Sequence, residues 1–413
     1  MTCITQKLQD QFTCMLKKVT DLTSAEIEAL LFLQTCLAAD PRFSLVRVAQ
    51  ASEGTYDREF LAHLLAKYAS IQDDVFQALL EEMVKQLGRR STFFLSIDDQ
   101  LVNKRGKKIY GVGKWADHQL KRKISALCLV DVAVVVQGQA VLAVPYLVLE
   151  SLVPPAQPNE KRSTNAQEQD AKTTAALALI TQLVGWLEIL QVRRNKIGVL
   201  ADAWYSNKRL RAFIRRMGLD YRIAGKKNYQ VHMPDFKRIQ RRKYGGRGRR
   251  PARYVRTRRL DQHMETVTRG GSFLDKTTGK RVRWKMATVT LDTGGRSRIF
   301  AFWRDGSKEP KYILTPARTT GVPGAPIVYR DYLWRWRVEE VHRDLKQQFG
   351  LRKSRNRKQA IVLGFLGLVY AFYSVFLLVR HNTLGDPAER LTAPRYQDAQ
   401  LYRLYVEQRV TFV

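Results

Sequence analysis

Three apolar stretches, STFFLSIDD (91–99), ISALCLVDVAVVV (124–136) and AVLAVPYLVLE (140–150), decide the fold of this chain. Each is a short run rich in β-branched, aliphatic or aromatic residues, which predicts a buried strand. The turn QGQ (137–139) separates the second and third runs, and the basic segment NKRGKK (103–108) follows the first. Three strands in succession predict an antiparallel meander.

The residues that follow alternate between helical and strand patterns. AKTTAALALITQLVGWLEILQ (171–191) predicts a long helix, and KIGVLADAWYS (196–206) predicts a buried strand. KRLRAFIRRMGL (208–219) predicts a basic amphipathic helix, and YRIAGKK (221–227) a further strand. With the meander before them and helices near the C-terminus, these elements follow the order of a ribonuclease-H-like α/β domain with a mixed sheet.

Residues 228–320 interrupt this pattern. Twelve of the 23 residues from Lys237 to Arg259 are Lys or Arg, and none is acidic. VRWKMATVTL (282–291) and SRIFAFWR (297–304) follow as strand-like pieces joined by glycine turns. The segment therefore predicts a β-rich insertion that carries a basic loop.

The first 90 residues read as helical. Thr23 and Glu26 have the spacing of a capping box at the start of a helix. After Pro41 the pattern predicts short helices joined by a turn near Gly54, which fits a helix-turn-helix and a plain helical bundle equally well. We expect four parts: an N-terminal helical DNA-binding domain (1–90), a ribonuclease-H-like domain (91–227 and 321–385), the insertion (228–320) and a C-terminal tail (386–413).

The composition is that of a globular chain with an unusual charge. At roughly 150 residues per domain, the 413 residues make two or three domains, and 45% of them are hydrophobic, which is enough for a sizeable core. Lys and Arg number 71 against 38 Asp and Glu, a formal charge of +33. Such an excess opposes compaction unless a polyanion screens it. Nucleic acid is the favoured polyanion, and an anionic membrane surface is the alternative.

The cysteines and the N-terminus indicate an intracellular protein. Cys3, Cys14, Cys36 and Cys128 form no CxxC pair, so neither structural disulfides nor a zinc site is expected. The start, MTCITQKLQD, has no basic segment followed by an apolar one, so we expect no signal peptide.

One uncharged run of 20 residues, AIVLGFLGLVYAFYSVFLLV (360–379), is long enough to cross a membrane. A helix that is buried on all sides in a large core has the same composition. Hydropathy alone does not choose between these interpretations.

Two strands end in acids. Asp98 and Asp99 end the strand FFLSID, and Asp202 ends the strand KIGVLAD. Converging carboxylates at strand ends suit a pair of divalent ions about 3.5–4 Å apart, which activate an attacking oxygen and stabilise a leaving one in phosphodiester chemistry. The alternative is that each acid caps the turn that follows it.

A third acid lies in DYLWRWRVEEVHRDLKQQFG (331–350), which predicts one helix. Arg335, Glu339 and Lys346 fall along one face of that helix, with Tyr332 one turn earlier. A carboxylate between two cations and a phenol suits metal and phosphate binding. The alternative is a solvated helix with ion pairs one turn apart.

The spacing Tyr-x2-Arg-x3-Glu-x6-Lys, together with FLSIDDQLVNKRGKK and VLADAWYS in that order, resembles bacterial transposases of the insertion-sequence-four type. The resemblance covers about residues 91–380, with 103 residues from Asp99 to Asp202 and 137 from Asp202 to Glu339. Gln100 replaces the usual Thr after the first aspartates, and Ala203 replaces the usual Ser after the second. The register of the motif favours Asp99 over Asp98 as the first acid.

The resemblance implies a ribonuclease-H-like core in which Asp99 (or Asp98), Asp202 and Glu339 bind two Mg²⁺ ions, with Mn²⁺ able to substitute. It implies that Tyr332, Arg335 and Lys346 grip DNA phosphates, and that the enzyme excises and reinserts a DNA element as a homodimer in the bacterial cytoplasm, associated with the nucleoid. Trp303 and Trp284 are candidates for stacking on a flipped base.

Further DNA contacts are expected in the basic segments. The helix 208–219 and the turn 103–108 would contact phosphates, and Tyr244 and Tyr254 would stack on bases. The loop cations expected to contact DNA are Lys237, Arg238, Arg241, Arg242, Arg247, Arg249 and Arg250. In such a fold the apolar run 360–379 packs in the core, where Gly364 and Gly367 allow a close approach, and no membrane is involved.

Three other functions fit parts of the sequence. A nuclease with the same core would lack strand transfer, and a domesticated DNA-binding protein would lack catalysis. A membrane-anchored basic protein would use residues 360–379 as its span.

Overall fold

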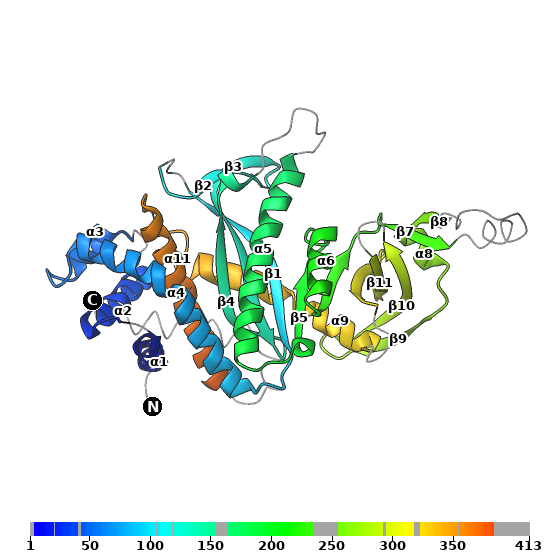
Figure 1. The fold of residues 1–413 in the computed structure, drawn as a ribbon, viewed down its shortest axis with the longest axis horizontal. Coiled ribbons are helices and arrows are strands. Elements are labelled where there is room, and N and C mark those ends of the chain that lie inside the picture. Colours follow the sequence, from blue (N-terminus) through cyan, green and yellow to red (C-terminus); the bar gives the residue numbers. More distant parts are fainter. Residues whose placement is uncertain are drawn as a thin grey trace, which may run out of the picture. The chain divides into compact units, whose positions relative to one another are not determined.

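A computed structural model of the chain describes residues 4–19, 21–39, 43–104, 106, 108–117, 119–153, 164–234, 255–291, 295–317, 323–353 and 355–383 (Figure 1). The fold is mixed α/β, and it divides into two compact units. The first unit comprises Met1–Lys196 and Trp336–Val413, and the second comprises Ile197–Arg335. The second unit thus starts before the expected insertion, and the domain limits given above stay a prediction.

The first unit is built on an antiparallel sheet. Its strands are β1 (Phe93–Asn103), β2 (Val112–Asp117), β3 (Arg122–Val136) and β4 (Gln139–Val148). β3 pairs with β1 along one edge and with β4 along the other, which confirms the predicted meander. β2 extends the second edge by pairing with the first half of β3. The sequence analysis missed β2, because VGKWAD is short and mixes glycine with charged residues.

Nine helical segments complete the first unit in the part of the chain that the structure describes. They are α1 (Ile4–Val19), α2 (Ser24–Ala39), α3 (Leu45–Ala51), α4 (Arg58–Leu87), η1 (Glu150–Leu152), α5 (Thr164–Ile189), η2 (Arg194–Lys196), α10 (Trp336–Gln347) and α11 (Gln359–Thr383). The predicted capping box is present, since the Thr23 amide donates to Glu26 at 2.8 Å and the Glu26 amide donates to the Thr23 hydroxyl at 3.2 Å. α4 is one long helix where the sequence predicted short ones.

The apolar run 360–379 lies inside α11, which packs along α4 and against β4 (Figure 1). By length and composition Gln359–Arg380 would suit a membrane span, but 94% of its apolar window is buried within the protein. Gly364 lies so close to α4 that an added Cβ would stand 1.8 Å from the Leu65 carbonyl oxygen, and at Gly367 it would stand 2.1 Å from Gln72 Oε1. Both glycines therefore allow the close approach that the core interpretation requires.

The second unit contains a larger mixed sheet. Its elements are β5 (Ile197–Ala201), α6 (Lys208–Arg216), β6 (Asp220–Gly225), β7 (Gln230–Pro234), β8 (Val255–Arg259), α8 (Leu260–Glu265), β9 (Gly270–Asp275), β10 (Lys280–Leu291), β11 (Gly295–Arg304), β12 (Lys311–Pro316) and α9 (Ala325–Leu333). The strand order is β5-β6-β12-β11-β10-β7-β8, with β9 also on β10. β5 and β6 are parallel, and the other pairs are antiparallel.

The single helix predicted over residues 331–350 is wrong. α9 ends at Leu333, and α10 begins at Trp336. Between them the amides of Trp334 and Arg335 donate to carbonyls three residues back, which makes a tight turn. The two helices bury different stripes in different units. Tyr332 and Val338 are six positions apart, and at 3.6 residues per turn a straight helix would place them on different sides.

Several predictions lie outside the described residues. They concern the basic loop from Lys237 to Tyr254 and the tail 386–413.

Candidate active site

Asp98 and Asp99 lie on opposite faces of the first unit's sheet, because successive side chains of a strand alternate. Asp99 contacts Lys172 of α5. Asp98 lies directly across from Asp131 of β3, whose side chain contacts helices α10 and α11. Figure 1 shows α5 on one face of this sheet and α10 on the other. Both acids are half-buried.

On the α5 face, Asp99 forms a tight ion pair. Its Oδ2 atom accepts a hydrogen bond from Lys172 Nζ at 2.6 Å, and the Lys172 side chain is only 4% exposed. Burial is the largest single influence and acts against the ammonium, but Asp99, Cys128 and Glu168 together outweigh it and raise the pKa of Lys172. Cys128 lies nearby, and burial raises the pKa of its thiol, so it is not a reactive thiolate.

On the α10 face, Asp131 is the centre of a buried polar group that we call the Asp131 cluster. It comprises Asp131 of β3, Gln100 of β1, His342 of α10 and Tyr370 of α11. Asp131 is 0% exposed. Its Oδ2 atom accepts from Gln100 Nε2 at 2.5 Å and lies 2.7 Å from His342 Nε2, and its Oδ1 atom accepts from the Tyr370 hydroxyl at 2.7 Å. Gln100, which replaces the family's usual Thr, is thus part of this cluster.

Glu339 and Lys346 lie on the same helix as His342. Glu339 is half-buried, three residues before His342, and Lys346 is four residues after it, so all three point to one side of α10. Burial lowers the pKa of Lys346, and the carboxylates of Asp131, Asp98 and Asp99 act in the opposite direction. Lys346 is therefore within electrostatic reach of both aspartates of β1.

Asp202 follows β5 in the second unit. Its Oδ1 atom accepts hydrogen bonds from the amides of Trp204 at 2.8 Å and Tyr205 at 3.1 Å. The side chain therefore caps the following turn, which is the alternative that the sequence left open for this acid. The cap also fixes the direction of this half-buried carboxylate.

Tyr332 packs in the core of the second unit. It is 3% exposed and belongs to an aromatic cluster with Phe300, Phe302 and Tyr329. Lys311 Nζ lies 5.0 Å from its ring centroid, and the Arg335 guanidinium carbon lies 6.0 Å from it. These contacts support a packing role for the ring, and its predicted phosphate contact stays a prediction.

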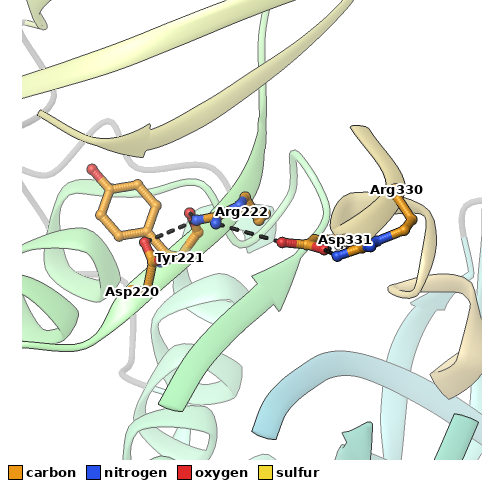
Figure 2. Close-up of polar contacts among 5 residues, drawn as sticks. All are labelled: Asp220, Tyr221, Arg222, Arg330 and Asp331. Carbon is orange, nitrogen blue, oxygen red and sulfur yellow. Dashed lines mark hydrogen bonds and ion pairs between the residues drawn. The ribbon is translucent and has the colours of Figure 1, made fainter. Parts of the chain in front are cut away.

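The residue before Tyr332 belongs to a second buried ion cluster, shown in Figure 2. Arg222 of β6 is 3% exposed; its Nη1 atom lies 2.8 Å from Asp220 Oδ1 and its Nη2 atom 3.5 Å from Asp331 Oδ2. Arg330 donates to Asp331 Oδ1 at 2.8 Å. Burial raises the pKa of Asp331, although both arginines act against that shift. The cluster ties α9 to β6.

The two candidate tryptophans lie on opposite faces of the β10–β11 hairpin. Trp284 pairs with Phe302 and packs partly into the core beneath Gly271. Trp303 pairs with the exposed Arg283 and is half-buried. An aromatic side chain beside an arginine suits base stacking better than one in a core, so Trp303 is the stronger candidate.

Only part of the basic surface expected outside the loop is exposed. On α6, Lys208, Arg209 and Arg216 are exposed, whereas Arg211 is buried beside the Tyr229 ring. In the turn 103–108, Lys104 is 6% exposed and donates to the carbonyls of Leu351 and Arg352. The Lys104 ammonium is therefore held by main-chain carbonyls, and the phosphate contact predicted for this turn stays a prediction.

The acids at the predicted positions have the right chemistry for Mg²⁺. Asp98, Asp99, Asp202 and Glu339 offer hard oxygen ligands and are all partly accessible to solvent. Asp202 belongs to the second unit and the others to the first. Within the residues that the structure describes, no group of three or more His, Cys, Asp or Glu is arranged to hold a metal ion.

The comparisons identify the family. The family described as DDE superfamily endonuclease matches residues 14–290, more than half of the chain, so the chain belongs to this family of nuclease and transposase-type enzymes. The match includes both aspartate blocks and ends before Glu339. Members of such a family act on DNA and use divalent metal ions. No curated protein matches the sequence.

The sequence analysis missed the Asp131 cluster. One signal was present, because Asp131 is the only charged residue in ISALCLVDVAVVV (124–136) and a lone acid in a buried strand needs partners. Those partners were not predictable, since His342 and Tyr370 lie more than 200 residues away in the chain.

Proposed function

We propose that the protein is a transposase of the insertion-sequence-four type, which excises a DNA element and joins it to a new site. Asp98, Asp202 and Glu339 would hold two Mg²⁺ ions, with Asp99 as the alternative first acid. When bound, such ions activate the attacking oxygen and stabilise the leaving one. Membership of the DDE superfamily endonuclease family carries this proposal, and the Tyr-Arg-Glu-Lys spacing extends it to the transposase type.

The choice of Asp98 rests on the faces of the sheet. Asp98 is on the face that α10 covers, which is the helix that carries Glu339 and Lys346. Asp99 is on the other face, where Lys172 occupies one of its oxygens at 2.6 Å. The motif register favoured Asp99, so this proposal departs from the sequence analysis.

The remaining side chains would bind and orient DNA. Lys346 and Arg335 supply cations for phosphate oxygens, and the exposed cations of α6 add backbone contacts. Trp303 with Arg283 offers a surface for an unstacked base. The loop cations around Arg247 would contribute to binding through counterion release, which makes affinity fall with salt.

The test uses the DNA that flanks the gene. Inverted repeats bracketing the gene would supply the substrate ends, and the full-length protein is incubated with those ends, a target plasmid and Mg²⁺. We expect cleavage at the repeat boundary and covalent joining of the ends to the plasmid. Asp202→Ala should abolish both reactions and retain DNA binding in a gel-shift assay.

Two results would lead to other functions. Cleavage without joining of pre-cut ends would indicate a nuclease, and binding without cleavage in the wild type would indicate a domesticated DNA-binding protein. Homodimer formation is tested on the DNA complex by light scattering.

A further inference from the structure

The Asp131 cluster connects four elements at one carboxylate. Asp131 is on β3, and its contacts come from β1, α10 and α11 through Gln100, His342 and Tyr370. Gln100 Nε2 also donates to the Tyr370 hydroxyl at 2.8 Å. The helix that carries Glu339 is therefore joined by a polar contact to the sheet that carries Asp98.

Polar contacts fix a helix in a way that apolar packing does not. α10 also buries Val338, Val341 and Leu345, but hydrophobic contact is non-directional and tolerates small rotations. A buried carboxylate requires its partners at hydrogen-bonding distance, because an uncompensated charge in the interior is costly. A small rotation of α10 would break the 2.7 Å contact between His342 and Asp131.

His342 is well placed to transmit this constraint. It lies one helical turn after Glu339 and one turn before Lys346. We propose that Asp131 is a positioning residue that, through His342, sets the rotation of α10 and so holds Glu339 and Lys346 over the face of the sheet that carries Asp98. This inference rests on the proposed role of Glu339 as a metal ligand.

The test compares four variants of the full-length protein. His342→Leu removes the contact with Asp131, whereas His342→Gln keeps an N–H donor. Tyr370→Phe removes one hydrogen-bond donor to Asp131 without altering any residue of α10. Ser374→Ala is the matched control, because Ser374 is on the same helix and its buried hydroxyl bonds to the Tyr370 carbonyl and to the Ala143 backbone of β4, and not to α10.

Two quantities are measured for each variant. One is the single-turnover cleavage rate at saturating DNA, with the dissociation constant measured separately. The other is the hydrogen-exchange rate of the α10 amides in protein without DNA. We expect His342→Leu to lower the cleavage rate about 100-fold, the scale of a 1 Å displacement of a catalytic group, with DNA affinity nearly unchanged and faster exchange in α10.

The other variants make the proposal refutable. His342→Gln should recover most of the rate and protection, Tyr370→Phe should show a smaller loss of both, and Ser374→Ala should resemble the wild type. If His342→Leu does not fold, the proposal is tested by comparing the cleavage rate and α10 exchange of Tyr370→Phe with those of the wild type. Wild-type rates and exchange in His342→Leu, or equal losses in the Gln and Leu variants, would overturn the proposal.

Failure of the proposed function has a different signature. A wild-type protein that cuts no DNA would refute the transposase assignment, and the exchange measurement would still decide whether Asp131 orders α10. Glu339→Gln provides the reverse control, because it should abolish cleavage and leave α10 exchange unchanged.

Discussion

The acids on the two faces of the β1–β3–β4 sheet have different surroundings. On the α5 face, Asp99 meets one lysine and its side chain keeps 19% exposure. On the α10 face, Asp131 is closed off completely and has three partners, and its neighbour Asp98 lies half-buried beside it. A single strand therefore has one acid in an ion pair on one face and another beside a rigid polar cluster on the other.

The largest expected effect comes from replacing each of the two aspartates of β1 in turn. Asp98→Asn should lower DNA cleavage by at least about 10³-fold, the scale on which an enzyme loses rate when a member of its catalytic set is removed. Asp99→Asn should lower the rate per folded molecule far less and should mainly reduce stability, because Lys172 loses its carboxylate. Cleavage rates and urea unfolding of both variants check this. If Asp99→Asn lowers the cleavage rate more than Asp98→Asn does, Asp99 and not Asp98 is the first metal ligand.

The two faces should also differ in stability. Asp131→Ala leaves the donors of Gln100 and Tyr370, and the His342 imidazole, without their carboxylate in a buried site, and it should lower the free energy of unfolding by about 3 kcal/mol. Lys172→Met leaves a carboxylate that water can reach, and it should cost only about 1 kcal/mol. Urea denaturation of both proteins gives the comparison. Equal losses would mean that solvent reaches the Asp131 cluster.

Helix packing gives a third comparison, between α11 and α5. In Gly364→Ala the new Cβ would meet the Leu65 carbonyl oxygen, which should force α4 and α11 apart and cost about 1–3 kcal/mol. Gly185 of α5 is the control, because an added Cβ there meets nothing within 4 Å. Gly185→Ala should be neutral or stabilise the protein by up to about 1 kcal/mol. Thermal unfolding of both variants is the measurement, and a neutral Gly364→Ala would contradict the close helix contact.

The pH dependence of stability gives a last comparison, between Lys104 and an ordinary surface lysine. Burial lowers the pKa of Lys104 from 10.5 to about 8. Between pH 8 and 10.5 the unfolded chain then binds more protons at this residue than the folded one, so its contribution to stability rises with pH across that window. Lys104→Met should remove this rise. Urea midpoints of both proteins from pH 7 to 11 test it, and parallel pH profiles would show that Lys104 keeps an ordinary pKa.

Much of the fold was predictable because hydrophobic periodicity is a local signal. The strand containing Asp98, the strand that Asp202 follows and the long helix after the meander all followed from short sequence patterns, whereas the core packing of α11 was expected only once the family resemblance was added. Strands β7, β8, β9 and β12 were missed, because they are short and are defined by their partners in the sheet.

The candidate site was predictable only in part, for a physical reason. Motif spacing predicted that Glu339 and Lys346 share a helix, and both lie on α10, but it did not reveal that Tyr332 belongs to a separate helix with its own core. A helix break of this kind depends on which unit each apolar stripe packs against. The Asp131 cluster depends on contacts between residues far apart in sequence, and no local pattern encodes them.

The burial of α11 has a consequence for how the chain is made. Until α11 meets α4, its 20 uncharged residues are an aggregation-prone segment exposed to water. α4 leaves the ribosome roughly 300 residues earlier, at a synthesis rate of about 5–20 residues per second. The surface of α4 is therefore synthesised well before α11, which packs closely against it. This order shortens the time during which α11 is exposed to water.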